Sequence, residues 1–232
     1  MKVAVIIPTW NAGRMLQEAL ESVAAQTVRP TQVVVVDDGS TDDSVDVVSA
    51  HPAVALIRQS RCGTAAARNT GIARTDADVV AFLDVDDLWP PRSLSVRIAA
   101  LREAGADGCY GVVEEFLDPA ALSRPVRPRS AARVPGSILV TREALARVGG
   151  FDESLPGGEG VDWVARFDAT GLRWTKVDDV VLRRRIHESN KSRDPQYAKR
   201  TGLLEVARRS IAAKRLAPSG RAHPAPARES SD

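Results

Sequence analysis

The segment from residue 79 to residue 90, VVAFLDVDDLWP, constrains the fold of this chain more than any other. Its five leading apolar residues predict a strand buried on both faces, as in a parallel sheet. The strand runs directly into three carboxylates, Asp84, Asp86 and Asp87, at the strand end where open α/β sheets bind ligands. Carboxylates this close repel one another unless a cation lies between them, and Mg²⁺ and Mn²⁺ prefer carboxylate and phosphate oxygens. We therefore predict a divalent-metal site here, with a solvated acidic loop as the alternative interpretation.

Three more apolar runs precede this strand in the sequence. They lie at residues 3–7, 32–36 and 54–58, and the second also ends in carboxylates, Asp37 and Asp38. The segments between them have helical patterns, for which we expect N-caps at Asn11, at Ser40 or Thr41, and at Thr64. This strand–helix alternation predicts an α/β fold with a doubly wound, mostly parallel sheet flanked by helices.

The second half of the chain has a weaker pattern. We expect helices at 94–104, 142–148 and 160–169, strands at 108–117 and 137–140, and two further strands within 172–185. Residues 118–135, rich in arginine, proline and serine, are expected to form a long loop. The pattern predicts a basic helix at 193–216 and a disordered tail at 217–232.

Composition and charge exclude several classes of protein. The net charge is only +2, and the basic stretch 183–215 has no interleaved aromatic residue besides Tyr197, so we expect no nucleic-acid partner. An anionic membrane surface or an acidic acceptor stays open as a partner of that stretch. The sequence shows no transmembrane segment and no signal-peptide pattern, and Cys62 and Cys109 are most simply free thiols. We therefore expect a cytoplasmic protein, with peripheral contact at the inner membrane face as an open alternative.

Five motifs in the chain point to one family. They are PTWN at 8–11, VVDDGSTD at 35–42, ARNTGI at 67–72, FLDVDDLW at 82–89 and VGGFDE at 148–153. In this order and spacing the chain resembles the family 2 inverting glycosyltransferases of the GT-A fold, over approximately residues 1–190. The resemblance implies a GT-A, Rossmann-like domain over 1–192, with a nucleotide-binding half at about 1–105 and a smaller, mixed acceptor-side half at about 106–192.

The resemblance also implies an activity and a set of ligands. The expected enzyme is a hexosyltransferase-like glycosyltransferase that uses Mn²⁺ or Mg²⁺ and a nucleotide-diphosphate sugar, with UDP as the expected nucleotide. The acceptor is not identified and could be a glycan, a lipid-linked sugar, a small metabolite or a peptide. Residues implied for nucleotide-sugar binding are Pro8, Thr9, Asn11, Asp37, Asp38, Arg68, Asp84 and Asp86. Residues implied for the metal are Asp86, Asp87 and His187.

Each of these residues also has a plainer interpretation. The DDGS segment is compatible with a simple turn and helix cap, in which Ser40 and Asp42 serve the backbone. Arg68 is equally compatible with a salt bridge within the sheet, and a lone histidine such as His187 is often structural.

The catalytic base is where the chain departs from the family pattern. Many members carry an adjacent Glu-Asp pair at the start of a helix, and here the stretch is GGEGVDWVARF. Glu159 matches the first acid, Gly160 stands in place of the second, and Asp162 follows. Inversion needs one carboxylate that accepts the acceptor's proton, so Glu159 is the first candidate and Asp162 the second. Acids also favour the first turn of a helix for electrostatic reasons alone.

Two other functions stay open. A nucleotidyltransferase of similar fold would bind a nucleotide and a metal at the same place, although such enzymes open with a glycine-rich loop where this chain has PTWN. A non-catalytic nucleotide-sugar-binding relative is the other alternative, because the Glu-Asp pair is altered.

Overall fold

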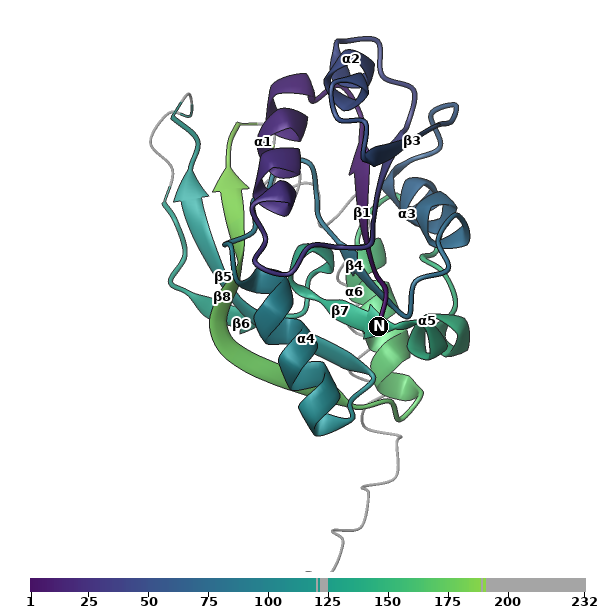
Figure 1. Ribbon diagram of the computed structural model, residues 1–232, viewed down its shortest axis with the longest axis vertical. Coiled ribbons are helices and arrows are strands. Elements are labelled where there is room, and N and C mark those ends of the chain that lie inside the picture. The colour runs from purple at the N-terminus through teal and green to yellow at the C-terminus, as the bar shows by residue number, and fades with distance from the viewer. Residues whose placement is uncertain (120, 122–124, 189, 191–232) are drawn as a thin grey trace, which may run out of the picture.

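The computed structural model describes residues 1–119, 121, 125–188 and 190 (Figure 1). Its described residues form one eight-stranded sheet with the order β3-β2-β1-β4-β7-β5-β6, in which β8 also pairs with β5. The strands are β1 (Val3–Thr9), β2 (Gln32–Asp37), β3 (Val54–Arg58), β4 (Val79–Phe82), β5 (Gly108–Leu117), β6 (Ser130–Ala132), β7 (Leu139–Thr141) and β8 (Trp174–Ile186). The predicted helix at 193–216 and the tail at 217–232 lie outside the described residues.

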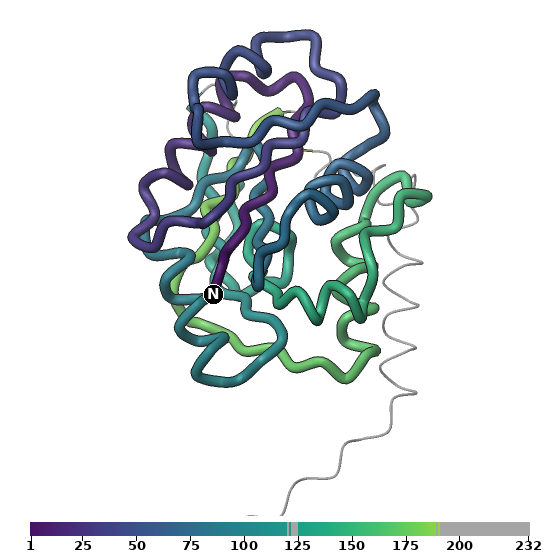
Figure 2. Tube along the Cα trace, turned by 45° about the vertical axis from the view of Figure 1, so that its right-hand side comes forward, coloured from purple at the N-terminus to yellow at the C-terminus, as the bar shows by residue number. Residues whose placement is uncertain are grey.

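The first half of the sheet is parallel, as the sequence predicts. Strand β1 pairs with β2 on one side and with β4 on the other, and β2 pairs with β3, all in parallel. All seven residues of β1 are buried, and the strand runs through the middle of the molecule (Figure 2). The carboxyl ends of β1, β2 and β4 therefore meet at one edge, because their registers place Thr9 beside Asp37 and Ile6 beside Phe82.

The second half of the sheet is mixed. Strand β7 runs antiparallel to both β4 and β5, and β6 runs antiparallel to β5. The prediction of two strands within 172–185 is wrong, because β8 is one strand that pairs in parallel with β5 through irregular registers near Val112. The loop expected at 118–135 contains β6, a short edge strand that owes its conformation to pairing with β5 rather than to its own sequence.

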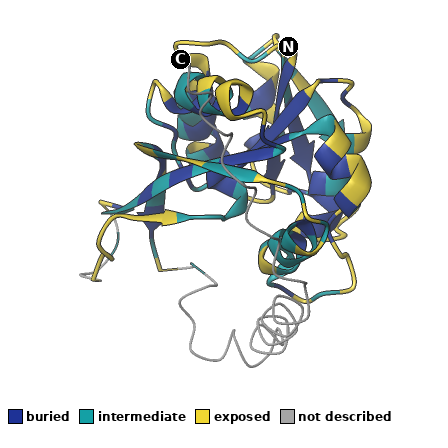
Figure 3. Cartoon of the chain, turned by 90° about the horizontal axis from the view of Figure 1, so that it is seen from below, coloured by how far each residue is buried: buried dark blue, intermediate teal, exposed yellow. Residues whose placement is uncertain are grey.

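Helices cover both faces of the sheet (Figure 1). One apolar core joins the sheet to α1 (Gly13–Ala24), α2 (Ser44–Ser49) and α4 (Ser93–Ala104). A second core on the other face joins it to α3 (Thr64–Ala73), α5 (Arg142–Val148) and α6 (Glu159–Ala169), and a short 3₁₀ helix, η1, spans Pro135–Ser137. The strands are buried between these layers while the helices keep exposed outer faces (Figure 3).

The predicted N-caps are wrong, because the helix termini are held by other parts of the chain. Asn11 has a left-handed backbone (φ 48°), and its side chain accepts a hydrogen bond from the Thr41 amide instead. The start of α1 is held by Asp42, which accepts from the Gly13 amide at 3.2 Å, and α2 begins at Ser44 beyond the expected caps. Helix α3 begins at Thr64 itself, after a glycine with positive φ. Tertiary contacts thus hold the start of α1, whereas Asp42 also accepts a local hydrogen bond from the Ser44 amide at the start of α2.

Candidate active site

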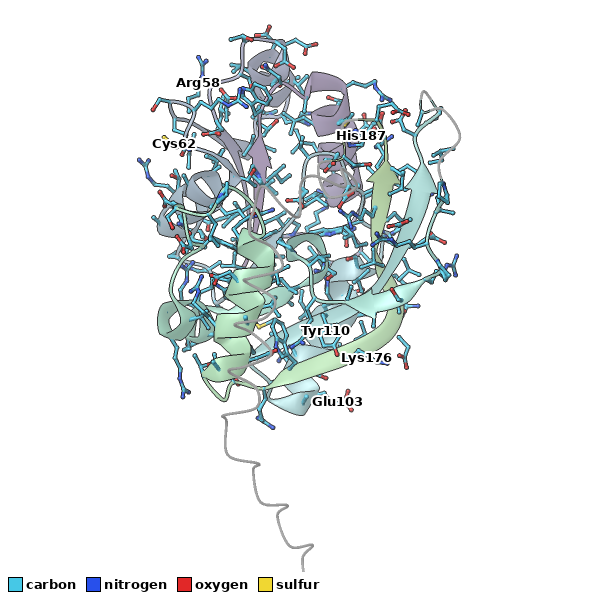
Figure 4. The ribbon with its side chains drawn as sticks, turned by 180° about the vertical axis from the view of Figure 1, so that it is seen from behind. Arg58, Cys62, Glu103, Tyr110, Lys176 and His187 are labelled. Atoms are coloured by element: carbon cyan, nitrogen blue, oxygen red, sulfur yellow. The ribbon has the colours of Figure 1, made fainter. Side chains whose placement is uncertain are left out.

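A pocket of about 520 Å³ opens at the carboxyl ends of β1 and β4. Its walls come from the segments 8–12, 84–87, 133–135 and 158–161 and from Arg184, His187 and Asn190. Seen from behind the sheet, His187 lies just beyond the end of β8, beside α1 (Figure 4). The pocket therefore joins the parallel half of the sheet to the mixed half, at the strand ends where open α/β sheets bind ligands.

Arg68 lies at the centre of this pocket and links its two halves. Its side chain is almost fully buried, and it donates to the Asp84 carboxylate at 2.5 Å and to the Glu159 carboxylate at 2.7 Å. Its Nε is buried without a hydrogen-bond partner among the described residues. Burial disfavours its charge, but the two carboxylates outweigh burial and raise the pKa of Arg68 above its ordinary value. The ARN motif thus places a cation between Asp84, which follows β4, and Glu159, at the start of α6.

Asp86 and His187 form the pair that best fits a divalent metal. His187 Nε2 lies 3.0 Å from Asp86 Oδ2, and Asn190 Nδ2 lies 3.5 Å from the same oxygen. Among the described residues, no three His, Cys, Asp or Glu side chains are grouped closely enough to hold a metal by themselves. Mg²⁺ and Mn²⁺ sites in nucleotide enzymes commonly use one or two protein ligands and take the rest from phosphate and water. The two side chains fit such a site.

Asp87 has a different environment from Asp86. Only 5% of it is exposed, and its Oδ1 accepts a hydrogen bond from the Arg185 amide at 3.0 Å. Burial, together with the nearby charges of Asp86 and Asp84, raises the pKa of Asp87 well above its ordinary value. Asp87 lines the pocket together with Asp86, while one of its carboxylate oxygens holds the β8 backbone, and its role as a metal ligand stays a prediction.

The carboxylates at the end of β2 serve the neighbouring loops. Asp38 lines the pocket, but it already accepts three hydrogen bonds of 2.8 Å from the loop 59–63. Asp37 is fully buried, accepts from the Ser40 amide and pairs with Arg58 at 3.2 Å. Asp37 does not line the pocket, so its position does not support the predicted nucleotide contact.

The loop after β1 brings an aromatic ring to the rim of the pocket. Trp10 is 39% exposed, and the Arg61 guanidinium lies 3.3 Å from its ring centroid. Behind it, the hydroxyl of Thr9 is buried without a hydrogen-bond partner among the described residues. Pro8 and Asn11 also line the pocket, as predicted residues of the PTWN motif. Sequence reasoning missed Trp10 as a site residue, although an exposed aromatic within a binding motif is a usable signal.

The two candidate bases differ in position. Glu159 lines the pocket at the start of α6, whereas Asp162 lies outside the lining and pairs with Arg166 at 2.8 Å. A Cβ atom added to Gly160 would lie 2.9 Å from both Cδ and Cγ of Pro135. The second acid of the family pair is therefore sterically disfavoured in this backbone, and Glu159 is the acid that α6 presents to the pocket.

Solved structures of similar fold identify the class. S. aureus TarS in complex with UDP-GlcNAc superposes with a TM-score of 0.74 at 20% identity, covering 94% of this chain and 68% of that one. The mannosyltransferase PcManGT from Pyrobaculum calidifontis, in complex with GDP-Man and Mn²⁺, gives 0.64 at 22% identity, covering 94% and 76%. These likenesses, together with the mixed sheet and its flanking helices, establish the GT-A type of α/β fold.

The sequence comparison identifies the family. The model of glycosyl transferase family 2 matches residues 4–146, and the chain belongs to that family. The pre-mycofactocin glycosyltransferase of Mycobacterium tuberculosis is 35% identical over 193 residues, covering 74% of this chain and 40% of that protein. An uncharacterized glycosyltransferase of Nostoc is 44% identical over 99 residues, covering 40% and 31%. The chain thus spans less than half the length of these two relatives.

In the part of the chain that the structure describes, no helix combines the length and the apolar character needed to cross a bilayer.

Proposed function

We propose that this chain transfers a sugar from a nucleotide-diphosphate donor, with inversion at the anomeric carbon and with the help of Mn²⁺ or Mg²⁺. The observation that carries the proposal is the Arg68 bridge, which joins Asp84 of the FLDVDDLW motif to Glu159 of α6 within one pocket. A donor diphosphate bound near the first acid would place its sugar toward the second. Family membership and the GT-A fold support the same function.

The donor side of the pocket suits a nucleoside diphosphate. The exposed ring of Trp10 offers a surface on which a base can stack, and the unpartnered Thr9 hydroxyl can bond a base or ribose. The Arg68 guanidinium suits diphosphate oxygens, and its unpartnered Nε leaves it a further donor. We infer UDP as the nucleotide, supported by the neighbour solved with UDP-GlcNAc, with GDP as the alternative given by the mannosyltransferase neighbour.

The metal would be held by Asp86 and His187, whose side chains meet at 3.0 Å. When bound, the ion supplies positive charge to the departing diphosphate. Asp84 would act on the donor indirectly, by orienting Arg68, and Asp38 would act indirectly, by holding the loop 59–63 beside the pocket. We leave Asp87 and Asp37 out of the contacting set because both carboxylates are buried in hydrogen bonds to the protein.

Glu159 would act as the base that takes the proton from the acceptor hydroxyl. Its contact with Arg68 holds the carboxylate in the pocket, but a nearby cation also weakens a base. We therefore expect the donor diphosphate to draw Arg68 away from Glu159, so that the base is released once the donor is bound. This order of events would protect the donor from premature attack by water.

Calorimetric titration tests the donor part of this proposal. UDP, GDP and TDP are titrated into the protein with Mn²⁺ and, separately, with EDTA. We expect binding of UDP that depends on Mn²⁺ and that falls strongly in Asp86→Asn. Absence of binding by every nucleotide, from a protein with a cooperative melting transition, would overturn the proposal.

The base assignment is tested with two matched acids on one helix. Glu159→Gln is expected to keep UDP affinity and to lose turnover of the donor sugar by about 10²–10⁴-fold. Asp162→Asn, which removes an acid one turn along, is expected to retain turnover within a few-fold. Equal turnover of both variants and wild type would show that neither is the base.

A non-catalytic nucleotide-sugar-binding protein is the second candidate function. Gly160 favours it, because the acid usual at this position is absent and Pro135 fills the space. This alternative predicts metal-dependent UDP binding together with an absence of donor turnover for any acceptor class, including water.

We also infer a cytoplasmic location. Cys62 and Cys109 are free thiols, which a reducing compartment would preserve. The acceptor stays open between the classes named from the sequence.

A further inference from the structure

A buried arginine lies next to residues 84–87, the carboxylate segment of the pocket. Arg185, near the end of β8, is only 2% exposed. Its guanidinium pairs with Asp118 at 3.0 Å and with Glu18 of α1. Arg14 completes the cluster through Glu18 at 3.0 Å and Asp118 at 3.1 Å. Two arginines and two acids thus join α1, β8 and the end of β5 on the side of the pocket where His187 lies.

The same arginine also holds the segment 84–87 directly. Its Nε donates to the Asp86 carbonyl oxygen at 3.0 Å, and its amide donates to the Asp87 carboxylate at 3.0 Å. Two residues earlier on β8, Arg183 and Leu88 exchange backbone hydrogen bonds of 2.8 and 2.9 Å. Strand β8 therefore fixes the carboxylate segment along one side, and Arg185 is the point where side chain and backbone both take part.

We propose that Arg185 is the positioning residue that sets the direction of the Asp86 carboxylate toward His187. The inference rests on the proposed function, in which these two side chains hold the metal. A peptide carbonyl that is held by a fixed donor restrains the backbone of Asp86, and with it the direction of the Cα–Cβ bond from which the carboxylate extends toward His187. Asp118 and Glu18 fix that donor in turn, because a buried guanidinium is stable only when its charge is paired.

The role requires arginine rather than any cation. The planar guanidinium donates in three separate directions here, to Asp118, to Glu18 and to the Asp86 carbonyl. The donors of lysine all lie on a single nitrogen at the end of a flexible chain, so one lysine cannot donate to all three of these separated acceptors. Arg185→Lys therefore keeps the positive charge of the cluster but is expected to lose the hold on Asp86.

The first test follows the backbone without any ligand. Hydrogen–deuterium exchange of the peptide 83–89 is compared between wild type, Arg185→Lys and Arg183→Lys. We expect exchange in this peptide to become about tenfold faster in Arg185→Lys, because one hydrogen bond to it is lost. Arg183→Lys is the matched control, since its side chain pairs with Glu114, is 44% exposed and does not line the pocket.

The second test measures the metal directly. The Mn²⁺ concentration needed for half-maximal UDP binding is expected to rise about 10- to 100-fold in Arg185→Lys, as for other residues that orient metal ligands, and to stay unchanged in Arg183→Lys. UDP affinity at saturating Mn²⁺ is expected to recover in both. Wild-type exchange and wild-type Mn²⁺ dependence in Arg185→Lys would overturn the inference.

The role of Arg185 can be tested separately from the proposed function. If wild type binds no nucleotide, the proposed function falls, but the exchange comparison still decides whether Arg185 holds the segment. If Arg185→Lys does not fold, Glu18→Gln tests the same point, because Glu18 is partly exposed and holds the guanidinium from the far side. Glu18→Gln should raise exchange in the same peptide by a smaller factor, and unchanged exchange would contradict the role of Arg185.

Discussion

Replacing Arg68 by methionine provides the sharpest energetic test of the site. Arg68 is buried, and its two carboxylate partners lie at 2.5 and 2.7 Å. Breaking a buried ion pair by removing one partner costs about 3–5 kcal/mol. Asp84 keeps 35% of its side chain exposed and Glu159 keeps 18%, so water can partly compensate for the loss. We therefore expect the free energy of unfolding to fall by about 3 kcal/mol, at the lower end of that range.

The assay is thermal and urea unfolding of Arg68→Met beside a matched control. A loss of this size lowers the melting temperature by about 6–12 °C, since each kcal/mol shifts it by about 2–4 °C in a domain of this size. The control is Arg58→Met, in which an arginine that is 59% exposed loses its pair with Asp37 at 3.2 Å. Only the arginine of that pair is exposed, and the buried Asp37 carboxylate keeps its hydrogen bond from the Ser40 amide, so we expect a smaller loss than for Arg68→Met.

The result that refutes this reasoning is equally definite. If the free energies of unfolding of Arg68→Met and Arg58→Met both lie within about 0.5 kcal/mol of wild type, the stability of the two carboxylates does not depend on Arg68. The proposal that Arg68 restrains Glu159 until the donor binds would then lose its basis.

Three further predictions concern residues around the site and in the core. Gly160→Asp should lower stability by about 1–3 kcal/mol in thermal unfolding, because its side chain would collide with Pro135, and Pro135→Ala in the same chain should relieve most of that loss. Asn69→Ala should lower the free energy of unfolding by about 2–4 kcal/mol in urea, because two hydrogen bonds to Phe151 are lost. The Asn69 side chain accepts from the Phe151 amide at 2.7 Å and donates to the Phe151 carbonyl oxygen at 2.9 Å. At pH 8 a thiol reagent should label the exposed Cys62 but not the buried Cys109. Burial raises the pKa of Cys109 to about 11, so only about a thousandth of this thiol is ionised at pH 8. Rapid labelling of both thiols in the native protein would contradict this prediction.

The strands and several helices could be predicted because their evidence is local. The expected bounds of β3, β5 and α5 coincide with those observed, and the other parallel strands differ by a residue or two. Apolar runs and helical periodicity directly reflect burial, which is the dominant favourable term in folding. The expected mixed half is also present, although β6 was missed because an edge strand depends on its partner.

Only some of the predicted site residues lie in the pocket. Arg68, Asp84, Asp86, Glu159 and His187 all line the pocket, and the motifs that contain them were visible in the sequence. Asp37 and Asp162 carry the same chemical group but lie outside the pocket lining, where they are bonded to Ser40 and Arg166. Asp87 lines the pocket, although it also accepts a hydrogen bond from the Arg185 amide. No periodicity distinguishes an acid that faces a ligand from an acid that holds a loop.

The sequence by itself determined the α/β class, the order of its strands along the chain and the strand ends at which acids gather. Those properties follow from patterns within a few residues, because a strand must bury its apolar side chains wherever it lies. Only the tertiary structure decided which acid meets which donor: Asp86 lies beside His187, 101 residues away, and Glu159 lies beside Arg68, 91 residues away. The orientation of a carboxylate depends on the charges and hydrogen-bond donors around it, and folding brings those from distant parts of the chain.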